Sequence, residues 1–149
     1  MSEHKTKLNW KRKDSGFGYK EFPRGHEWGF PRSGQTLRAS AAPEYLGDAD
    51  RADPEEAFTA ALTSCHMLTF LAVAERKGLA VTAYEDDAVG YLGKDERGRM
   101  AVVRVELRPR ITFAGEAPDE AAMASLHKRA HRGCFLANSV RSEVVVLDT

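Results

Sequence analysis

The two cysteines of this chain are the side chains best suited to chemistry. Cys65 stands in the apolar stretch ALTSCHMLTF, and Cys134 stands in the stretch GCFLA. Taken singly, each thiol is most simply a packing residue, because free cysteine is among the most buried residue types. As a pair they allow redox chemistry, since a thiol oxidised to sulfenic acid can condense with a second thiol. A peroxidatic and a resolving cysteine have this arrangement.

A reactive Cys65 requires a positive charge nearby. Apolar surroundings raise the pKa of a thiol, so a thiolate at neutral pH needs a cation or a strong hydrogen-bond donor beside it. Arginine keeps its charge when it is removed from water. We therefore expect an arginine from the N-terminal strands beside Cys65, and the candidates are Arg12, Arg24 and Arg38.

Glu55 is the acidic candidate for the same site. Glu55 and Glu56 fall in the first turn of a predicted helix, where the helix dipole favours negative charge and explains both. Glu55 precedes Cys65 by ten residues, which is about 15 Å along one helix. Direct contact within one chain is therefore excluded if the helix is continuous. Two such helices packed antiparallel in a dimer would instead bring Glu55 of one chain to Cys65 of the other.

Histidine and cysteine offer a second chemistry, a metal site. His127, His131 and Cys134 recur at i, i+4 and i+7, and Cys65 with His66 could complete the cluster. Zinc accepts ligands of these types on neighbouring helical turns. No CxxC or HExxH motif accompanies them, and solvated histidines at a helix C-terminus explain the same pattern.

Composition excludes several function classes. The chain has 149 residues, with 22 basic and 22 acidic side chains, so no overall charge attracts nucleic acid or a membrane. We expect neither a signal peptide nor a membrane span, because the N-terminus lacks an apolar segment and polar residues interrupt the central apolar run. Two cysteines form no zinc-finger spacing and no secreted disulfide framework. The sequence thus predicts a cytoplasmic protein with reactive rather than structural thiols.

The elements that must position the cysteines begin with a central helix over residues 53–77. Asp53 is a suitable N-cap, Pro54 suits the first helical position, and Gly78 suits the position after the end. Apolar side chains occur on all sides of this helix, which predicts burial on most sides. A single domain of residues 1–149 is small for enclosing such a helix, so we expect a partner subunit.

The remaining pattern predicts an α+β fold with antiparallel sheets. Strands are expected within residues 1–52, in particular at 4–12, 17–30 and 35–41, before a loop over 42–52. Two long strands joined by the turn KDERGR form a hairpin over 79–114, and an amphipathic helix follows at 118–132. One further turn in LANSV and a closing strand at 143–148 complete the chain. No glycine-rich phosphate loop is present in the sequence.

The central helix carries a family resemblance. The order Asp53-Pro54-Glu55-Glu56, Ala60-Ala61, Cys65 resembles the pattern Asn-Pro-Glu-(Glu/Gln), Ala-Ala, Ala-Cys of the OsmC/Ohr family, with the same ten-residue step from Glu to Cys. These proteins are small thiol-dependent peroxidases that reduce organic hydroperoxides. The second cysteine, late in the chain between a helix and a strand, also agrees. Three positions depart from the pattern: Asp53 replaces Asn, His66 replaces the common Phe, and Cys134 lacks a following Pro.

The resemblance implies a homodimer with interleaved sheets around two central helices and active sites at the interface. It implies Cys65 as peroxidatic thiol, Cys134 as resolving thiol, and Glu55 with an arginine holding the thiolate; Arg38, on the strand before the helix, is the arginine we favour. The substrate would be a hydrophobic hydroperoxide, the reductant an external dithiol such as a lipoyl group, and no bound cofactor or metal is expected. Two alternatives remain: an OsmC-like protein that binds a small apolar ligand without catalysis, and a Cys/His metal protein.

Overall fold

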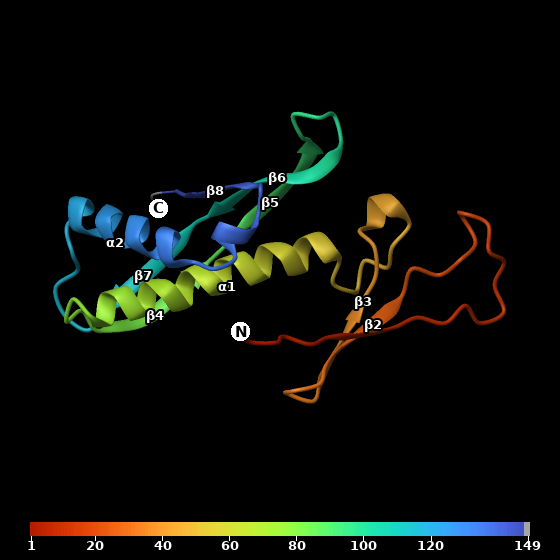
Figure 1. The fold of residues 1–149 in the computed structure, drawn as a ribbon, viewed down its shortest axis with the longest axis horizontal. Helices are drawn as coiled ribbons and strands as arrows, with labels where there is room; N and C mark the ends of the chain where they lie inside the picture. Colours follow the sequence, from red (N-terminus) through yellow and green to blue (C-terminus); the bar gives the residue numbers. More distant parts are fainter. Residues whose placement is uncertain (148–149) are drawn as a thin grey trace. The chain divides into compact units, whose positions relative to one another are not determined.

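The chain folds into two compact units with different element content. The structure, a computed structural model, describes residues 1–147 (Figure 1). The first unit comprises Met1–Ala57 and the second begins at Phe58. Two α-helices and eight strands in three sheets make up the described residues, which confirms the predicted α+β class.

The first unit is built on a three-stranded antiparallel sheet. In its register Trp28 is paired with Leu8 on one side and with Leu37 on the other. The predicted strand over 17–30 is shorter in the structure, because the guanidinium of Arg24 donates hydrogen bonds to the carbonyls of Tyr19 and Phe22 and holds that segment in turns. The strands are β1 (Lys7–Asn9), β2 (His26–Phe30) and β3 (Gln35–Ala39), followed by a short 3-10 helix, η1 (Pro43–Tyr45).

The central helix, α1 (Pro54–Glu75), begins and ends within two residues of its predicted bounds. At its start Asp53 and Glu56 cap each other: the Glu56 N–H donates to Asp53 Oδ1 over 2.7 Å, and the Asp53 N–H donates to Glu56 Oε2 over 3.1 Å. At its end Gly78 has a φ of 71°, the left-handed conformation that glycine adopts most easily. The predicted stop signals therefore operate as expected.

The predicted pair of long strands is present as a hairpin, but each strand is divided. Asp86 ends the first half, and its Oδ1 accepts the backbone N–H of Arg108 over 2.7 Å at the opposite break. A side chain thus takes the place of a ladder hydrogen bond, and Pro109, which has no N–H, follows. Of the four resulting strands, the first pairs with the fourth and the second with the third, and both pairs are antiparallel. The four are β4 (Val81–Asp86), β5 (Val89–Lys94), β6 (Met100–Leu107) and β7 (Pro109–Phe113).

The C-terminal elements complete the second unit. Helix α2 (Glu120–Gly133) is capped by Asp119, and η2 (Ala137–Ser139) is the further turn predicted in LANSV. Strand β8 (Glu143–Val146) joins β6 in parallel, whereas the other pairs of named strands are antiparallel, as predicted. Along the chain, the segment that contains α2 separates β6 from β8. This segment returns the chain to the end of the sheet at which β6 begins, so β8 runs in the same direction as β6. Residue 148 of the predicted strand lies outside the described residues.

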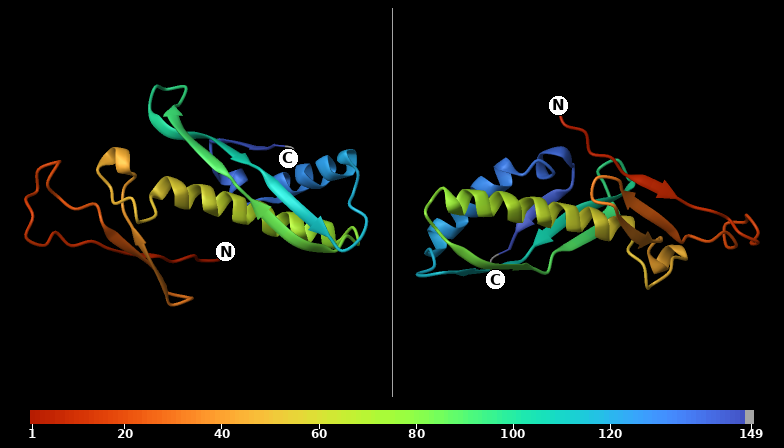
Figure 2. Two further views of the ribbon diagram at one scale, coloured as in Figure 1. Left: turned by 180° about the vertical axis from the view of Figure 1, so that it is seen from behind. Right: turned by 90° about the horizontal axis from the view of Figure 1, so that it is seen from below.

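Helices α1 and α2 lie on the same face of the strands of the second unit (Figures 1 and 2). Phe70 and Ala74 of α1 are buried against Leu126 and Ala130 of α2. The predicted burial of α1 on most sides is wrong for the single chain, in which Leu68 is 61% exposed. By length and composition α1 is the one helix among the described residues that could cross a membrane, a criterion that the core helix of a soluble protein also meets.

A matched pair of phenylalanine substitutions tests this core. Phe70 is fully buried and Phe135 is 81% exposed. We expect Phe70→Ala to lower the free energy of unfolding by about 3–5 kcal/mol, because it leaves a cavity between α1 and α2. Phe135→Ala should change it by less than about 1 kcal/mol. Urea unfolding followed by circular dichroism measures both, and equal losses would contradict this description of the core.

Candidate functional site

The structure brings the two cysteines together. Cys65 lies on α1 and is half-buried, Cys134 follows the last residue of α2 and is buried, and both are free thiols. The thiols of Cys134 and Cys65 lie close enough to interact: burial first, then the interaction with Cys65, raises the pKa of Cys134. Cys134 is therefore held as a neutral thiol against a partner that solvent can reach.

Close helix packing supports this contact. Gly133 ends α2, and a Cβ built there would lie 3.0 Å from the Cγ2 of Thr69 on α1. A larger residue at position 133 would push the helices apart beside the thiols. The Ala137 N–H donates to Cys134 Sγ over 3.4 Å, and Thr69 Oγ1 donates to the carbonyl of Cys65 over 2.8 Å. The first bond holds the sulfur of Cys134, and the second holds the backbone of Cys65.

A pair of histidines, one buried and one half-buried, includes the residue that follows Cys65. His66 is only 1% exposed, and its Nε2 lies 3.1 Å from Nδ1 of His127 on α2. His127 also contacts the ring of Phe70, with 4.7 Å between centroids. Burial first, then the neighbouring His127 and His131, lowers the pKa of His66 to about 4. His66 is therefore neutral at physiological pH.

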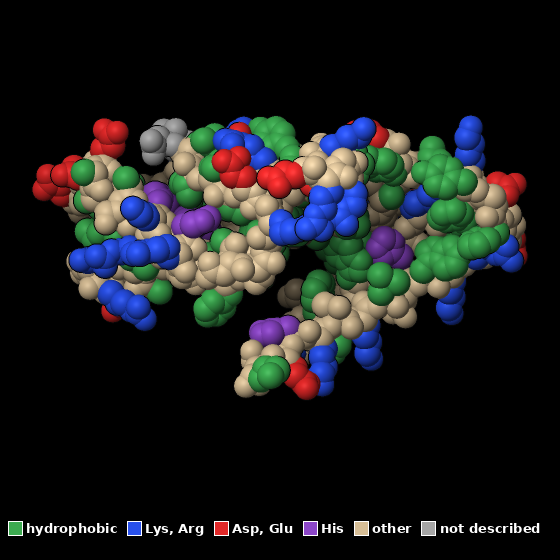
Figure 3. Space-filling model, turned by 45° about the horizontal axis from the view of Figure 1, so that its top comes forward, with side chains coloured by type: hydrophobic (Ala, Val, Ile, Leu, Met, Phe, Trp, Pro, Cys, Tyr) green, Lys and Arg blue, Asp and Glu red, His purple; other side chains and the backbone are tan. Residues whose placement is uncertain are grey.

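The histidine pair corrects the prediction that these side chains are solvated at a helix C-terminus. The i, i+4, i+7 spacing of His127, His131 and Cys134 in the sequence indicated that these side chains share one face of a helix. Only the packing of α2 on α1 shows that His66 contacts His127 on that face. His131 is half-buried. Histidine side chains come to the surface of the second unit beside lysine and arginine in Figure 3. Within residues 1–147, no three His, Cys, Asp or Glu side chains are grouped closely enough to hold a metal ion.

The acidic candidate lies at the start of α1. Glu56 is exposed and is occupied by the cap with Asp53, whereas Glu55 is half-buried. The helix is continuous from Pro54, so Glu55 precedes Cys65 by ten helical residues, as the prediction assumed. Glu55 is thus the carboxylate that helix capping does not require.

The three candidate arginines differ in their contacts within the first unit. Arg38 on β3 pairs with Asp50 over 3.5 Å, and its side chain is 65% exposed. Arg12 lies over the ring of Phe17 at 5.6 Å. Arg24 is held more firmly: its guanidinium lies 3.8 Å from the centroid of Phe22 and donates to the Phe22 carbonyl over 2.6 Å.

Arg24 also borders an apolar pocket of about 420 Å³ in the first unit. The indole N–H of Trp10 donates to the carbonyl of Pro23 over 2.8 Å and holds one wall. Pro54, the residue before Glu55, lines the same pocket. The pocket thus joins aromatic walls, one guanidinium and the first residue of α1. Its lining consists of Leu8, Trp10, Phe17, Phe22, Pro23, Arg24, His26, Ser40, Ala41 and Pro54.

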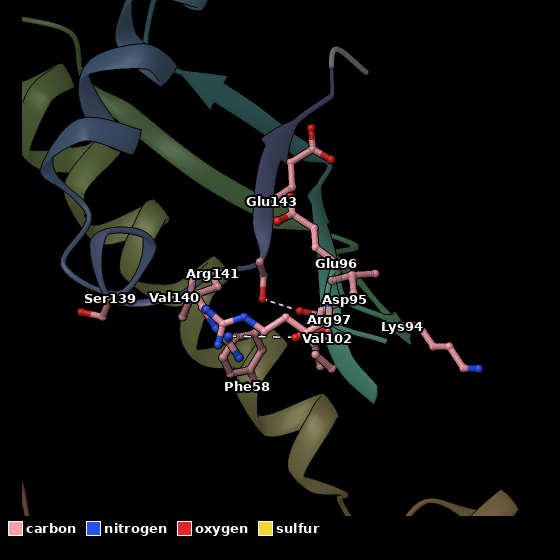
Figure 4. A pocket seen from close by; sticks show the side chains of 13 residues that line it. Phe58, Lys94, Asp95, Glu96, Arg97, Val102, Ser139, Val140, Arg141 and Glu143 are labelled. Carbon is pink, nitrogen blue, oxygen red and sulfur yellow. Dashed lines mark hydrogen bonds and ion pairs between the residues drawn. The ribbon is translucent and has the colours of Figure 1, made fainter. Parts of the chain in front are cut away.

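A larger hollow of about 900 Å³ lies in the second unit (Figure 4). Phe58, Val102 and Val140 form its apolar part, and the guanidinium of Arg141 lies 4.0 Å from Asp95 across it. Three cationic and three anionic side chains line it, so it favours neither charge. Neither cysteine is among its described lining residues, so it is separate from the thiol pair.

Comparison with known proteins identifies the family. A family model described as OsmC-like protein matches residues 47–147. The solved structure of an OsmC-like protein of unknown function from Vibrio cholerae is 44% identical to this chain, with a TM-score of 0.94 and 100% of each chain covered. No protein with a curated function matches the sequence.

Two more distant structures share the fold. An organic hydroperoxide resistance protein from Elizabethkingia anophelis is 18% identical, with a TM-score of 0.71 over 99% of this chain and 96% of its own. A putative organic hydroperoxide resistance protein from Vibrio cholerae, with captopril bound in one of its active sites, is 18% identical, with a TM-score of 0.68 over 99% of this chain and 92% of its own.

The lowered pKa of His66 predicts a pH dependence of stability. The unfolded side chain binds a proton near its ordinary pKa of 6.5 and the folded one only near 4, so the unfolded state binds more protons between these values. Stability should therefore fall as pH drops from 6.5 to 4, by up to about 3 kcal/mol from this group. Urea unfolding at several pH values should show a smaller fall for His66→Phe than for the wild type. His4→Phe, a change at an exposed histidine, should follow the wild type, and an unchanged slope in His66→Phe would contradict the assignment.

Proposed function

Because the chain belongs to the OsmC-like family, we propose that it is a thiol-dependent peroxidase that reduces organic hydroperoxides in defence against oxidative stress. The observation that carries the proposal is the contact of two free thiols, one half-buried and one buried. A thiol that reacts with the substrate must be accessible from solvent. A second thiol that only condenses with the oxidised first thiol need not be accessible. Exposure therefore assigns the peroxidatic role to Cys65 and the resolving role to Cys134.

Each step balances with these two sulfurs and an external dithiol. The Cys65 thiolate attacks the distal oxygen of R′OOH, the O–O bond breaks, and with one proton R′OH leaves while Cys65 becomes a sulfenic acid. The thiol of Cys134 then attacks the Cys65 sulfur, and the hydroxyl leaves with the thiol proton as water. The resulting disulfide is reduced by two thiols of the external dithiol, for which a lipoyl group has suitable chemistry.

A homodimer would complete the site. The single chain leaves apolar side chains of α1 exposed, such as Leu68, and a second copy packed on this helix would bury them. With the two helices antiparallel, Glu55 and a guanidinium of one chain would serve Cys65 of the other. A thiolate beside a guanidinium has a lowered pKa, and a carboxylate that binds the guanidinium orients it.

The arginine that serves this role is a choice between two residues. Arg38 stays the prediction from the family resemblance. The local contacts favour Arg24, because its guanidinium is oriented by carbonyls and aromatic rings beside an apolar pocket next to Pro54, whereas Arg38 is exposed. That pocket suits the hydrophobic part of an organic hydroperoxide. With balanced charge and reactive thiols, we place the protein in the cytoplasm.

Substitution of each cysteine tests the assigned roles. We expect Cys65→Ser to abolish turnover of cumene hydroperoxide with a lipoyl-type dithiol, because no other described thiol can replace it. Cys134→Ser should still consume one equivalent of peroxide to form Cys65 sulfenic acid, and a second equivalent should convert this to sulfinic acid, with no disulfide formed. Peroxide consumption and peptide masses measure both outcomes. Full activity of Cys65→Ser would exclude the assignment.

Substitution of the arginines separates Arg24 from Arg38. We expect Arg24→Met to lower kcat/KM for the hydroperoxide about a hundredfold, the usual loss for one preorganised cationic or polar donor. Arg38→Met should lower it less than about threefold, as should the control Arg32→Met in an exposed turn. The reverse order of Arg24 and Arg38 would establish Arg38 as the thiolate partner.

The first-unit pocket supports one alternative function, the binding of a small apolar ligand without catalysis. Its lining is almost wholly apolar and includes neither cysteine. Thiols that stay reduced in the presence of stoichiometric hydroperoxide, together with saturable binding of an apolar probe, would favour this function. Oxidation of Cys65 by the same amount of hydroperoxide would favour the peroxidase.

A further inference from the structure

His66 and His127 form a polar contact between two helices whose other contacts here are apolar or small. His66 lies directly after Cys65 on α1, and His127 lies on α2, which ends immediately before Cys134. Their neighbours across the same interface are Phe70 and, at the end of α2, Gly133 against Thr69. The histidine contact and the thiol contact therefore connect the same two segments.

The geometry of the two rings makes this contact directional. The ring planes differ by 12°, the centroids lie 5.4 Å apart, and the joined nitrogens lie 3.1 Å apart. The nitrogens are closer than the centroids by about two ring radii, so the rings meet edge to edge and the shared proton lies in their plane. Such a hydrogen bond constrains both distance and orientation.

Burial determines which nitrogen carries the proton. Nδ1 of His66 is buried and has no hydrogen-bond partner among the described residues. An unpaired buried N–H is costly, so the favoured tautomer leaves Nδ1 without hydrogen and has Nε2–H of His66 donate to Nδ1 of His127. In this arrangement the donor comes from α1 and the acceptor from α2.

We propose that the His66–His127 hydrogen bond positions the resolving thiol, because it holds α2 in the register on α1 that places Cys134 beside Cys65. Loss of His127 leaves the buried Nε2 of His66 unpaired, and the helices can pair it with water only by separating. The thiol contact at the end of α2 is weakened by that movement. His66 and His127 are thus positioning residues, and the inference rests on the two-cysteine function proposed above.

Equilibrium with glutathione measures the placement of the thiols without any peroxide chemistry. In the reaction of oxidised glutathione with the reduced protein, the protein gains one Cys65–Cys134 disulfide and two reduced glutathione molecules are released. The equilibrium constant reports how closely the folded protein holds its two sulfurs. Whole-protein mass after acid quenching gives the bridged fraction at each glutathione ratio.

Two pairs of variants separate the hydrogen bond from packing. Asparagine at position 127 retains an acceptor near the place of Nδ1, and glutamine at position 66 retains a donor near the place of Nε2, whereas leucine offers neither. We expect His127→Leu and His66→Leu to lower the equilibrium constant about tenfold. His127→Asn and His66→Gln should stay within about threefold of the wild type, because they keep the hydrogen bond. Lys128→Gln, a change on α2 beside His127, should leave the constant unchanged.

Each outcome of this experiment either supports or overturns the positioning role of His66 and His127. Leucine variants that bridge as well as the wild type, or Asn and Gln variants that lose as much as the leucine variants, would overturn the proposal and leave the peroxidase function intact. If the leucine variants do not fold, the folded Asn and Gln variants decide by the same threshold of about threefold. A wild-type protein that forms no Cys65–Cys134 disulfide would instead refute the two-cysteine function, and the positioning role with it.

Discussion

The packing of the end of α2 on the middle of α1 is the constraint on which the thiol chemistry depends. Gly133 allows the helices to approach closely at Thr69, and the next residue brings its sulfur to Cys65. The apolar contact of Phe70 with Leu126 and Ala130 supplies the free energy for this approach. Apolar packing alone does not fix the register of α2 along α1, whereas the hydrogen bond between the two histidines depends on that register.

In the proposed function, the different burial of the two sulfurs gives them different roles. A buried thiol with a raised pKa remains protonated and is protected from oxidants, whereas a half-buried thiol on a helix surface is open to a substrate. In the proposed function a substrate-facing thiolate needs a cation, and within the first unit Arg24 is a guanidinium oriented beside aromatic rings. Of the two adjacent acidic residues, Glu56 forms the reciprocal cap with Asp53, so the cap does not require Glu55.

Local signals in the sequence predicted the helices well. Asp53, Pro54 and Gly78 act within a few residues of chain, so the bounds of α1 followed from them. The broken hairpin was not predicted, because the hydrogen bond from Arg108 to Asp86 joins residues far apart in sequence. The parallel pairing of β8 with β6 likewise depends on where the chain returns after α2. The apolar composition of α1 was plain in the sequence, and the structure shows that a single chain leaves part of this surface exposed, as at Leu68.

The sequence by itself showed the two cysteines and the ten-residue step from Glu55 to Cys65. It also predicted the capping of α1 and showed the spacing of His127, His131 and Cys134. Periodicity and capping depend on neighbours along the chain, and the sequence displays them directly. Only the tertiary structure decided that the thiols touch, that His66 is buried against His127, and that Arg24 rather than Arg38 is enclosed by aromatic rings. These are contacts between distant segments, and they depend on the angle and register at which helices and strands pack, which no local pattern encodes.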